Sequence, residues 1–555
     1  MQKSLILFSF LLHLQILSGQ VIEIQVDGEF LDWQSLNPTH LDVLGDGRDN
    51  IDFRALFVSN DPDYLFLYFD VGQEINLQDN NAITLYIDID NNLSTGTTVN
   101  GIGADIRYTF GDRDGRYQYS GSQSVDIDHE DIGIVGMPTV TSDRFEVAIK
   151  RSGQIEGRAY ELADEIRMVI RDVRGGGDVL PNNGGVQYTM GDTPPAPNDF
   201  HFVKDPEDFR VLSFNSEFDG FFDFETSAAQ QRMVRAIDAD IMGFQEIYDF
   251  TSADIVNVIK DDLEGPWYHA KRFPDVHCVS RFPILDQASI NGNGAFLLDL
   301  GEREVLFINV HFPCCDNDFD RQAEVDNVMR FIRESKEGQE SVPIQEDTPI
   351  LIVGDMNLVG FADQLHTLIT GDIANNGAFG PDFGPDWDGE DLADAIPLVT
   401  GLPLAYTYED ESSSFGPGRL DFVLYTSSVL KASNSFVLKT ETLSPDIRNQ
   451  ANLQFDDSQS SDHLPVVVDF ASDFRVSNVE LDVKPVYKVF PQPASQFLHV
   501  EGQFDELKLF SINGNLVQTT VLADLDVRQL KAGVYILSIS TKEVEVFQKV
   551  VIGGR

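Results

Sequence analysis

Polar side chains that could carry out chemistry stand at the ends of short apolar runs between residues 205 and 471. The clearest run is Pro-Ile-Leu-Ile-Val-Gly-Asp-Met-Asn at 349–357, which suits a strand that is buried on both faces. Asp355 and Asn357 follow Gly354 two residues apart, so they would project in the same direction if the strand geometry continued. The end of a buried strand is where α/β folds usually carry their active sites. Taken alone, the stretch fits equally well a turn in which Asp and Asn bond to the backbone.

The same pattern recurs along this region. Further apolar runs with polar residues at one end occupy 210–215, 241–246, 305–311, 419–425 and 461–465. Their polar residues are Asn215, Glu246, Asn309, His311, Asp421, Asp462 and His463. Singly, Asn215 could cap a helix, Glu246 could be a surface acid and His463 could be a hydrogen-bonded core histidine. Together they predict one convergent site, because buried strands seldom end on ionisable groups unless those groups meet.

Helices are expected between these strands. Apolar residues recur at helical spacing in 227–239 and in 321–337, which predicts amphipathic helices there. Strands that alternate with helices indicate an α/β domain over residues 205–471.

The ordered motifs of this domain resemble those of the endonuclease/exonuclease/phosphatase superfamily. They are Asn215, Gln245-Glu246, Asn309-x-His311, Gly354-Asp355-Met-Asn357, Arg419-x-Asp421 and Ser461-Asp462-His463. The superfamily includes pancreatic-type deoxyribonucleases, apurinic endonucleases, neutral sphingomyelinases and inositol-phosphate phosphatases. The resemblance implies a four-layer α/β sandwich that hydrolyses phosphoesters at one edge of its sheets.

The resemblance also implies a metal site and a general base. Glu246, helped by Asn215 and Asp462, would hold Mg²⁺, Mn²⁺ or Ca²⁺ through hard oxygen ligands. Such an ion would polarise the phosphoryl oxygen and neutralise developing charge. His463, oriented by Asp421, would act as a general base on water or as a donor to the phosphate.

Other residues of the set have implied roles as well. Asp355 competes with His463 for the role of positioning or deprotonating the nucleophile, and Asn357 would bond a phosphate oxygen. His311 would donate to the phosphate or to the leaving oxygen, as in the deoxyribonuclease and sphingomyelinase branches. The sequence departs from the family at His277-Cys-Val-Ser-Arg281, where many relatives have a small residue and Leu. It is therefore in doubt whether the preceding loop supplies the Tyr or Arg that it supplies in many relatives. Tyr268, Lys271 and Arg272 are the possible substitutes for that residue.

The charge of the chain bears on its substrate. The formal net charge is −52, which disfavours broad electrostatic capture of nucleic acid or of an anionic membrane. Residues 355–418 contain twelve acidic residues and no lysine or arginine, so a long polyanion would be held poorly there. No apolar hairpin suited to insertion into lipid stands out. We expect a secreted, divalent-metal-dependent phosphodiesterase of nuclease type that acts on DNA, RNA or a small phosphodiester. The alternatives are a sphingomyelinase-like enzyme, a small-molecule phosphatase and a catalytically silent glycan-binding protein of the cell surface.

Residues 21–200 show a different pattern, rich in Asp, Asn and Gly. Alternating runs predict strands at 55–58, 64–69, 83–87, 106–110 and 145–149, with the spacing of a β-sandwich. An Asp-Gly…Asp-Trp element at 27–33 and an Asp-x-Asp…Thr-Gly turn at 88–96 resemble the family 9 carbohydrate-binding-like, DOMON-related sandwiches. The resemblance implies a sandwich that binds a sugar, haem or no ligand.

Two features of this region could bind a ligand. Asp88, Asp90 and Asn92 offer three oxygen ligands within five residues before Gly96, and could hold a structural Ca²⁺. An acidic β-turn is equally consistent with them. Trp33 could stack on a glycan, although a lone Trp more often belongs to a core.

Both ends of the chain resemble export signals. Residues 1–20 have a basic start, an apolar centre and small residues near their end, which predicts a signal peptide. No later stretch is apolar enough to span a membrane. Residues 487–555, after a linker at 472–486, resemble the C-terminal sorting domain of type IX secretion, although Gln492 stands where that family has Asn. The resemblance implies a bacterial protein that uses the type IX machinery and is secreted or attached to the cell surface. A small adhesion sandwich is the alternative.

The chain is therefore expected to be multidomain, with an N-terminal β-sandwich, a central four-layer α/β sandwich and a small C-terminal β-sandwich. Its three cysteines are Cys278, Cys314 and Cys315, and an odd number leaves at least one without a bridge. The adjacent pair lacks the spacing of a zinc site, so a structural role is expected. A bridge from Cys278 to one of the pair would suit an oxidising compartment.

Overall fold

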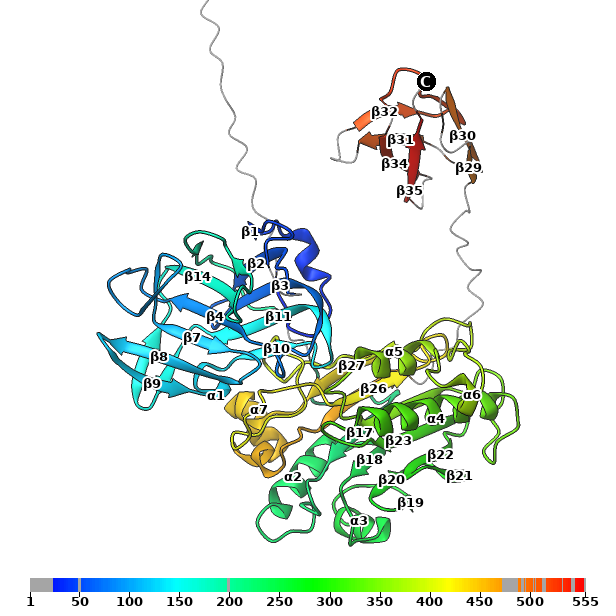
Figure 1. The fold of residues 1–555 in the computed structure, drawn as a ribbon. Coiled ribbons are helices and arrows are strands. Elements are labelled where there is room, and N and C mark those ends of the chain that lie inside the picture. Colours follow the sequence, from blue (N-terminus) through cyan, green and yellow to red (C-terminus); the bar gives the residue numbers. More distant parts are fainter. Residues whose placement is uncertain are drawn as a thin grey trace, which may run out of the picture. The chain divides into compact units, whose positions relative to one another are not determined.

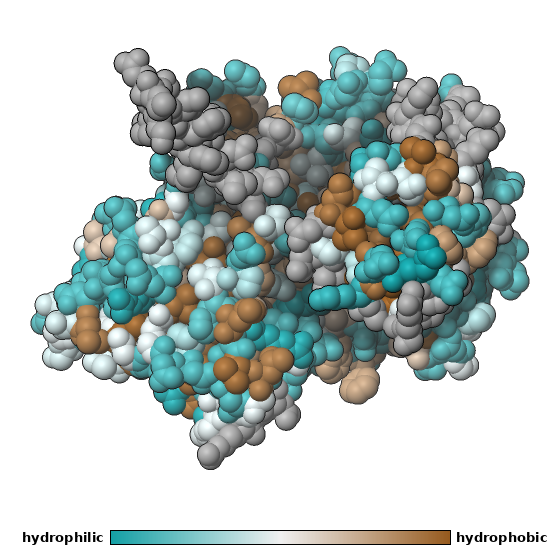
Figure 2. All heavy atoms as spheres, turned by 90° about the horizontal axis from the view of Figure 1, so that it is seen from above, coloured by the Kyte–Doolittle hydropathy of each residue, from teal (hydrophilic) through white to brown (hydrophobic). Residues whose placement is uncertain are grey.

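The computed structural model describes residues 23–47, 51–196 and 200–471, and residues 488–553 except for 491–493, 495, 503, 505, 512–515, 532 and 541–544. The chain forms two compact units, Met1–Phe474 and Arg475–Arg555 (Figure 1). The predicted signal peptide and linker lie outside the described residues. Figure 2 shows hydrophobic residues exposed in small groups among hydrophilic ones. Among the described residues, no helix is long and apolar enough to cross a membrane.

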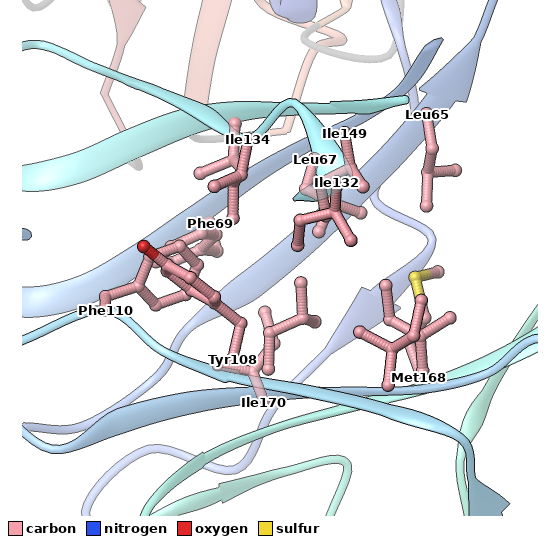
Figure 3. Close-up of a cluster of buried hydrophobic side chains, with 14 of the residues drawn as sticks. Leu65, Leu67, Phe69, Tyr108, Phe110, Ile132, Ile134, Ile149, Met168 and Ile170 are labelled. Carbon is pink, nitrogen blue, oxygen red and sulfur yellow. The ribbon is translucent and has the colours of Figure 1, made fainter. Parts of the chain in front are cut away.

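The first unit begins with a β-sandwich of two antiparallel sheets, as predicted. One sheet has the strand order β1-β2-β3-β11-β10 and the other β15-β14-β4-β7-β8-β9, with β16 also paired to β14. Apolar side chains alternate along the strands and meet between the sheets. Figure 3 shows Leu65, Leu67 and Phe69 of β3 opposite Met168 and Ile170 of β14. The elements are η1 (Asp32–Ser35), β1 (His40–Leu41), β2 (Ala55–Asn60), β3 (Tyr64–Ile75), β4 (Ile83–Asp88), β5 (Thr97–Val99), β6 (Ile102–Ala104), β7 (Ile106–Thr109), β8 (Asp114–Ser120), β9 (Gln123–Ile127), α1 (His129–Ile132), β10 (Val135–Met137), β11 (Ser142–Lys150), β12 (Ser152–Ile155), β13 (Arg158–Glu161), β14 (Glu165–Asp172), β15 (Val179–Leu180) and β16 (Val186–Thr189).

The central domain is the predicted four-layer α/β sandwich. Its two sheets have the orders β19-β20-β18-β17-β28-β27 and β21-β22-β23-β24-β26-β25. Helices α2 and α3 pack on the outer face of the first sheet, and α4 and α5 pack on that of the second. The strands are β17 (Asp208–Asn215), β18 (Ile241–Gln245), β19 (Tyr268–Arg272), β20 (Val276–Ser280), β21 (Ile284–Ile290), β22 (Asn293–Asp299), β23 (Glu304–His311), β24 (Ile350–Asp355), β25 (Ala393–Asp394), β26 (Asp421–Tyr425), β27 (Ala432–Val437) and β28 (Val466–Ala471). The helices are α2 (Ser227–Ile237), α3 (Ser252–Ile259), α4 (Asp318–Lys336), α5 (Ala362–Thr370), α6 (Asn376–Phe379), η2 (Thr440–Thr442), α7 (Pro445–Ala451) and η3 (Asp457–Ser460).

Strand register brings the polar strand ends to one edge of the two sheets. In the first sheet β17 and β18 are parallel, and Asn215 pairs with Gln245, the residue before Glu246. In the second sheet β23 and β24 are parallel, and His311 pairs with Asp355. Strand β26 runs antiparallel to β24 and starts where β24 ends, so that Asp421 pairs with Asp355. Residues far apart in the sequence therefore meet at one place.

The sandwich and the central domain share a hydrophobic core. Trp33 and Phe66 of the sandwich lie in the same cluster as Leu404 and Val423 of the central domain. Val26 pairs with Leu404 in a parallel bridge, and its N–H donates to Pro403 O at 2.8 Å. Trp33 is 1% exposed and donates from Nε1 to Glu146 Oε2 at 2.8 Å, so it is a core residue and no platform for a sugar.

The second unit is a small β domain with its own core. Its sheets have the orders β29-β30-β33 and β32-β31-β34-β35. Leu498, Leu509 and Leu537 are buried between them. The strands are β29 (Lys488–Phe490), β30 (Phe497–Glu501), β31 (Glu506–Ser511), β32 (Leu516–Thr520), β33 (Asp524–Asp526), β34 (Gly533–Ser540) and β35 (Glu545–Ile552).

The pairing of the cysteines differs from the bridge that was considered for Cys278. Cys314 and Cys315 form a disulfide with each other. Cys278 is free and fully buried in β20, packed in the core between sheets and sandwich, so the bridge considered from Cys278 is wrong.

Candidate active site

Glu246 stands at the centre of the strand-end cluster. It follows β18 directly and has a positive φ of 59°, which turns its side chain out of the strand direction. Its N–H donates to Asp275 Oδ2 at 3.0 Å, and its Oε2 accepts from Phe218 N–H at 3.0 Å. The remaining oxygen, Oε1, accepts one long bond from Asn215 Nδ2 at 3.2 Å. The Asp275 carboxylate and the Phe218 N–H therefore fix Glu246, while its Oε1 faces the site.

Asp355 lies beside Glu246 at the end of β24 and is buried. Its Oδ2 accepts from Asn215 Nδ2 at 3.0 Å and from Asn357 Nδ2 at 2.9 Å, and its Oδ1 accepts from Asn357 N–H at 3.0 Å. Burial raises the pKa of Asp355, and the Asp421 charge adds to this, while the two neighbouring histidines oppose it. Asn215 and Asn357 thus hold this carboxylate between them. In this orientation Asn215 turns its Nδ2 toward both carboxylates, and its Oδ1 accepts from Glu217 N–H.

His463 and Asp421 form a buried pair. Nδ1 of His463 donates to Asp421 Oδ2 at 2.7 Å, and its Nε2 lies 3.7 Å from Asp355 Oδ2. Burial opposes protonation, but the charges of Asp421 and Asp355 outweigh it and raise the pKa of His463 to about 10. Asp421 thus fixes the tautomer and direction of the ring, so that Nε2 faces the site.

His311 forms a second pair of the same kind with Asp275, a residue that the sequence did not indicate. Nδ1 of His311 donates to Asp275 Oδ2 at 2.6 Å. Its Nε2 lies 3.7 Å from both Glu246 Oε1 and Asp355 Oδ2. Burial opposes protonation of this ring too, but the hydrogen bond to Asp275 and the charges of Asp355, Asp275 and Glu246 raise its pKa to about 9. Asp275 stands just before β20, in a strand hairpin that the sequence pattern did not predict, so the strand-end argument could not reach it.

Asp462 completes the acidic side of the site. Burial raises its pKa to about 6, and the charges of Glu217, Glu246 and Asp355 act in the same direction while that of His463 opposes them. Its N–H donates to Glu217 Oε2 at 3.2 Å. The structure therefore brings together all eight residues predicted for catalysis and for the metal: Asn215, Glu246, His311, Asp355, Asn357, Asp421, Asp462 and His463.

The cluster contains more negative than positive charge. Ligand atoms of Glu246, His311 and Asp355 lie within 4.8 Å of one another, and so do those of Asp355, Asp421 and His463. Within the described part of the chain, these carboxylates form ion pairs only with the two histidines. Oδ1 of Asp421 is buried without a hydrogen-bond partner. Hard oxygen donors with uncompensated charge are the chemistry of a divalent-cation site.

Other polar residues singled out in the sequence serve the fold. Asn309 is fully buried and donates to Phe244 O and His277 O, so it joins the two sheets and does not converge on the site, contrary to the expectation for it. Lys271 donates to three backbone carbonyls of the loop after β18, and Arg272 to two others. Arg419 pairs with Asp394. These cations are engaged in the fold and do not contact the site's carboxylates.

The N-terminal acidic turn has a composition slightly different from the one predicted. Carboxylate oxygens of Asp88, Asp90 and Asp105 lie within 4.8 Å of one another, with Asp105 in the place expected for Asn92. Asn92 Oδ1 instead accepts from Ser94 N–H. Burial, together with the charges of Asp90 and Asp88, raises the pKa of Asp105 to about 7.

Comparison with known families agrees with the geometry. Residues 212–463, from within β17 to His463, match the model of the Endonuclease/Exonuclease/phosphatase family. These residues belong to that family. The endonuclease/exonuclease/phosphatase domain is therefore a phosphoester hydrolase domain, and its last matched residue is the histidine of the Asp421 pair. Residues 488–553 match the Secretion system C-terminal sorting domain, which supports secretion or attachment to the cell surface in bacteria.

Solved structures are similar to part of the chain at low sequence identity. TDP2 from C. elegans is 14% identical over 48% of this chain and 75% of that chain, with a TM-score of 0.32. The human Nocturnin catalytic domain with bound sulfate is 14% identical over 49% of this chain and 96% of that chain, with a TM-score of 0.31. A family member from Leptotrichia buccalis is 15% identical over 47% of this chain and 98% of that chain, with a TM-score of 0.30. No curated protein matches the chain.

Proposed function

We propose that the chain is a secreted, divalent-cation-dependent phosphodiesterase of nuclease type. The observation that carries the proposal is the meeting of two histidine–carboxylate pairs with Glu246 and Asp355 at one sheet edge. Two imidazoles that face one acceptor from different sides suit the hydrolysis of a phosphodiester, because the attacking water must lose a proton and the leaving oxygen must gain one.

The residues present fit a divalent cation. Glu246 Oε1 and the nearby Asp462 carboxylate would supply oxygens, and no lysine or arginine among the described residues pairs with them. The cation would be Mg²⁺, Mn²⁺ or Ca²⁺, and when bound it would polarise a phosphoryl oxygen and neutralise charge that develops there. Asn215 positions Glu246 and Asp355 in the orientation described above, and a rotation of its amide would present the oxygen that the ligand role needs.

Proton transfer is assigned from geometry. Asp355 Oδ2 lies 3.7 Å from Nε2 of both His311 and His463, so it can take up the proton of a water placed between the rings. Asp421 and Asp275 each hold the Nδ1 of one ring, which leaves Nε2–H free to donate to the phosphate or to the leaving oxygen. Asn357 Nδ2 is bonded to Asp355 and to Phe312 O, and would reach a phosphate oxygen only by giving up one of these bonds.

The acidic surroundings favour small substrates over long duplexes. The stretch from Asp355 to Gly418 carries twelve acids and no base, and Lys271 and Arg272 are bound within the fold. A nucleic acid held along its length needs cations that contact successive phosphates. We therefore expect turnover of short or single-stranded DNA and RNA and of small phosphodiesters before turnover of duplex DNA.

The test is hydrolysis of bis-p-nitrophenyl phosphate by the full-length protein with Mg²⁺, Mn²⁺ or Ca²⁺, before and after chelation with EDTA. Glu246→Gln and His463→Ala should reduce turnover by ~10²-fold or more, since general acid–base groups and metal sites each contribute on that scale. Glu390→Gln, on the exposed acidic stretch, is the matched control and should leave turnover unchanged. Equal rates in wild type and in Glu246→Gln, or rates indifferent to EDTA, would overturn the proposal.

A panel of substrates then separates the alternatives. DNA, RNA, sphingomyelin and sugar phosphates distinguish nuclease, sphingomyelinase and phosphatase activities. The silent glycan-binding alternative predicts no turnover of any of them, together with retention on immobilised glycan. The burial of Trp33 speaks against that alternative.

A further inference from the structure

A hairpin of residues 409–418 rises beside the active site. Its arms are joined at their base, where Thr407 and Tyr408 N–H both donate to Gly418 O and Gly418 N–H donates to Tyr408 O. The base is also bonded to the catalytic segment: Tyr408 forms an antiparallel bridge with His463, and Glu409 N–H donates to Asp462 O at 2.9 Å. The position of the hairpin and that of the Asp462–His463 segment are therefore linked through the backbone.

Tyr408 carries this link to the side chains. Its ring meets the His463 ring edge-on, with 5.4 Å between the centroids. Burial raises the pKa of the Tyr408 hydroxyl, and the charges of Asp462, Asp410 and Glu217 act in the same direction. The Ser413 side chain of the hairpin lowers the pKa of this hydroxyl, so it acts against the effect of burial. Tyr408 thus joins the base of the hairpin to His463 through both its backbone and its ring.

The hairpin tip is held by the N-terminal sandwich. Gly416 N–H donates to Gln78 Oε1 at 2.7 Å, and His129 Nε2 donates to Ser413 O at 3.1 Å. The Arg113 guanidinium lies over the Phe415 ring, 3.9 Å from its centroid. Three separate parts of the sandwich therefore grip one short hairpin.

The sandwich also contacts the chain that follows Asn357. Asn76 Nδ2 donates to Val359 O at 2.7 Å, and Thr141 N–H donates to Gly360 O at 2.9 Å. Thr139 Oγ1 accepts from Arg419 N–H at 2.8 Å, two residues before Asp421. Every one of these contacts is on a segment that leads directly to a site residue.

We propose that the N-terminal sandwich is a positioning element of the hydrolase, which keeps Tyr408 against His463 by fixing the 409–418 hairpin. The inference rests on the proposed function, because its effect is read in turnover. The tip is rich in serine and glycine and forms no regular strand, so without the sandwich its conformation would be one of many. A shift of His463 by about 1 Å is enough to reduce a rate by ~10²-fold. The sandwich therefore acts on kcat without contacting the substrate.

The experiment removes single contacts between the sandwich and the hairpin, one from each partner. The sandwich is not deleted, because its deletion would expose the core that it shares with the central domain. Gln78→Ala removes the bond to Gly416, and Phe415→Ala removes the contact with Arg113. Gln118→Ala is the matched control, since Gln118 bonds to Gly121 O on a distant turn of the sandwich. Each variant is made in the wild-type and in the Tyr408→Ala background, and kcat and KM for bis-p-nitrophenyl phosphate are measured with hydrogen exchange of the hairpin amides.

Gln78→Ala with Phe415→Ala should lower kcat by ~10-fold or more with little change in KM, and should speed amide exchange in 409–418. The same pair should have no further effect on kcat in the Tyr408→Ala background, which a merely structural loss would not produce. Unchanged kcat, or an equal fall in both backgrounds, would overturn the inference. If the wild-type protein hydrolyses nothing, the proposed function fails, and unchanged exchange of the hairpin amides would then overturn the positioning inference separately.

Discussion

The Asp275→Asn substitution tests the second histidine pair most sharply. His311 Nδ1 and Glu246 N–H both donate to the same oxygen, Asp275 Oδ2, so an asparagine oxygen can accept both bonds while the charge is lost. The pKa of His311 is raised from 6.5 to about 9, and Asp275 supplies the largest of the contributions that raise it. We expect the pKa of His311 to fall by ~2 units in the variant, which corresponds to ~3 kcal/mol of lost preference for the imidazolium.

The sign of the pH dependence follows from this shift. A histidine whose pKa is raised by folding stabilises the native state fully below its unfolded pKa of 6.5, and the effect is lost as the pH rises through about 9. Wild type should therefore exceed Asp275→Asn in unfolding free energy by up to ~3 kcal/mol at pH 6, and the difference should vanish by about pH 10. Turnover of the variant should fall by ~10²-fold at pH 8 and recover in part at pH 6, where the ring regains its proton.

Two measurements check the reasoning. NMR titration of the imidazole in EDTA-treated protein gives the pKa of His311, and urea unfolding at pH 6 and pH 10 gives the stability difference. Glu390→Gln again serves as a charge-matched control on the surface. A His311 pKa that stays near 9 in the variant, or a stability difference that does not change with pH, would refute the electrostatic role assigned to Asp275.

Further predictions concern the framework of the site. His277 is buried, its Nε2 donates to Ile247 O, and burial lowers its pKa to about 4. As the pH falls from 6.5 to 4, the unfolding free energy of wild type should therefore drop by on the order of 3 kcal/mol relative to that of His277→Gln, as measured by urea unfolding. Arg210 and Asp469 form a buried two-bond ion pair, and Asp469→Asn should destabilise the fold by ~3–5 kcal/mol in the same assay because a buried guanidinium loses its partner. Trp33→Phe removes the bond to Glu146 and should cost ~1–3 kcal/mol of stability with no effect on retention by glycan.

The meeting of these strand ends could be predicted from the sequence because the strands that carry them are buried on both faces. The apolar run at 350–353 suits a strand buried on both faces, and Asp355 at the end of that strand lies at the sheet edge. The pairing of His311 with Asp355 and of Asp355 with Asp421 follows from strand register, which the sequence analysis did not predict.

The parts that could not be predicted depend on contacts between distant segments. Asp275 lies on a loop whose flanking strands are short and partly polar, so no pattern marked it. Asn309 has the same place in its strand as residues that reach the site, and only the packing of one sheet on the other shows that it bonds across the core. The link from the sandwich through the hairpin to Tyr408 depends on contacts between distant segments, and no sequence pattern near residue 408 indicates it.

The pairing of Val26 with the segment at 403–405 constrains the order in which the molecule can be completed. Val26 N–H donates to Pro403 O and Ala405 N–H donates to Val26 O, so one of the first described residues is tied to a stretch in the second half of the central domain. Contacts of such large sequence separation form slowly, because a long loop must close first. A chain that leaves its ribosome or crosses a membrane from its N-terminus would keep this edge of the sandwich unsealed until the hydrolase has emerged.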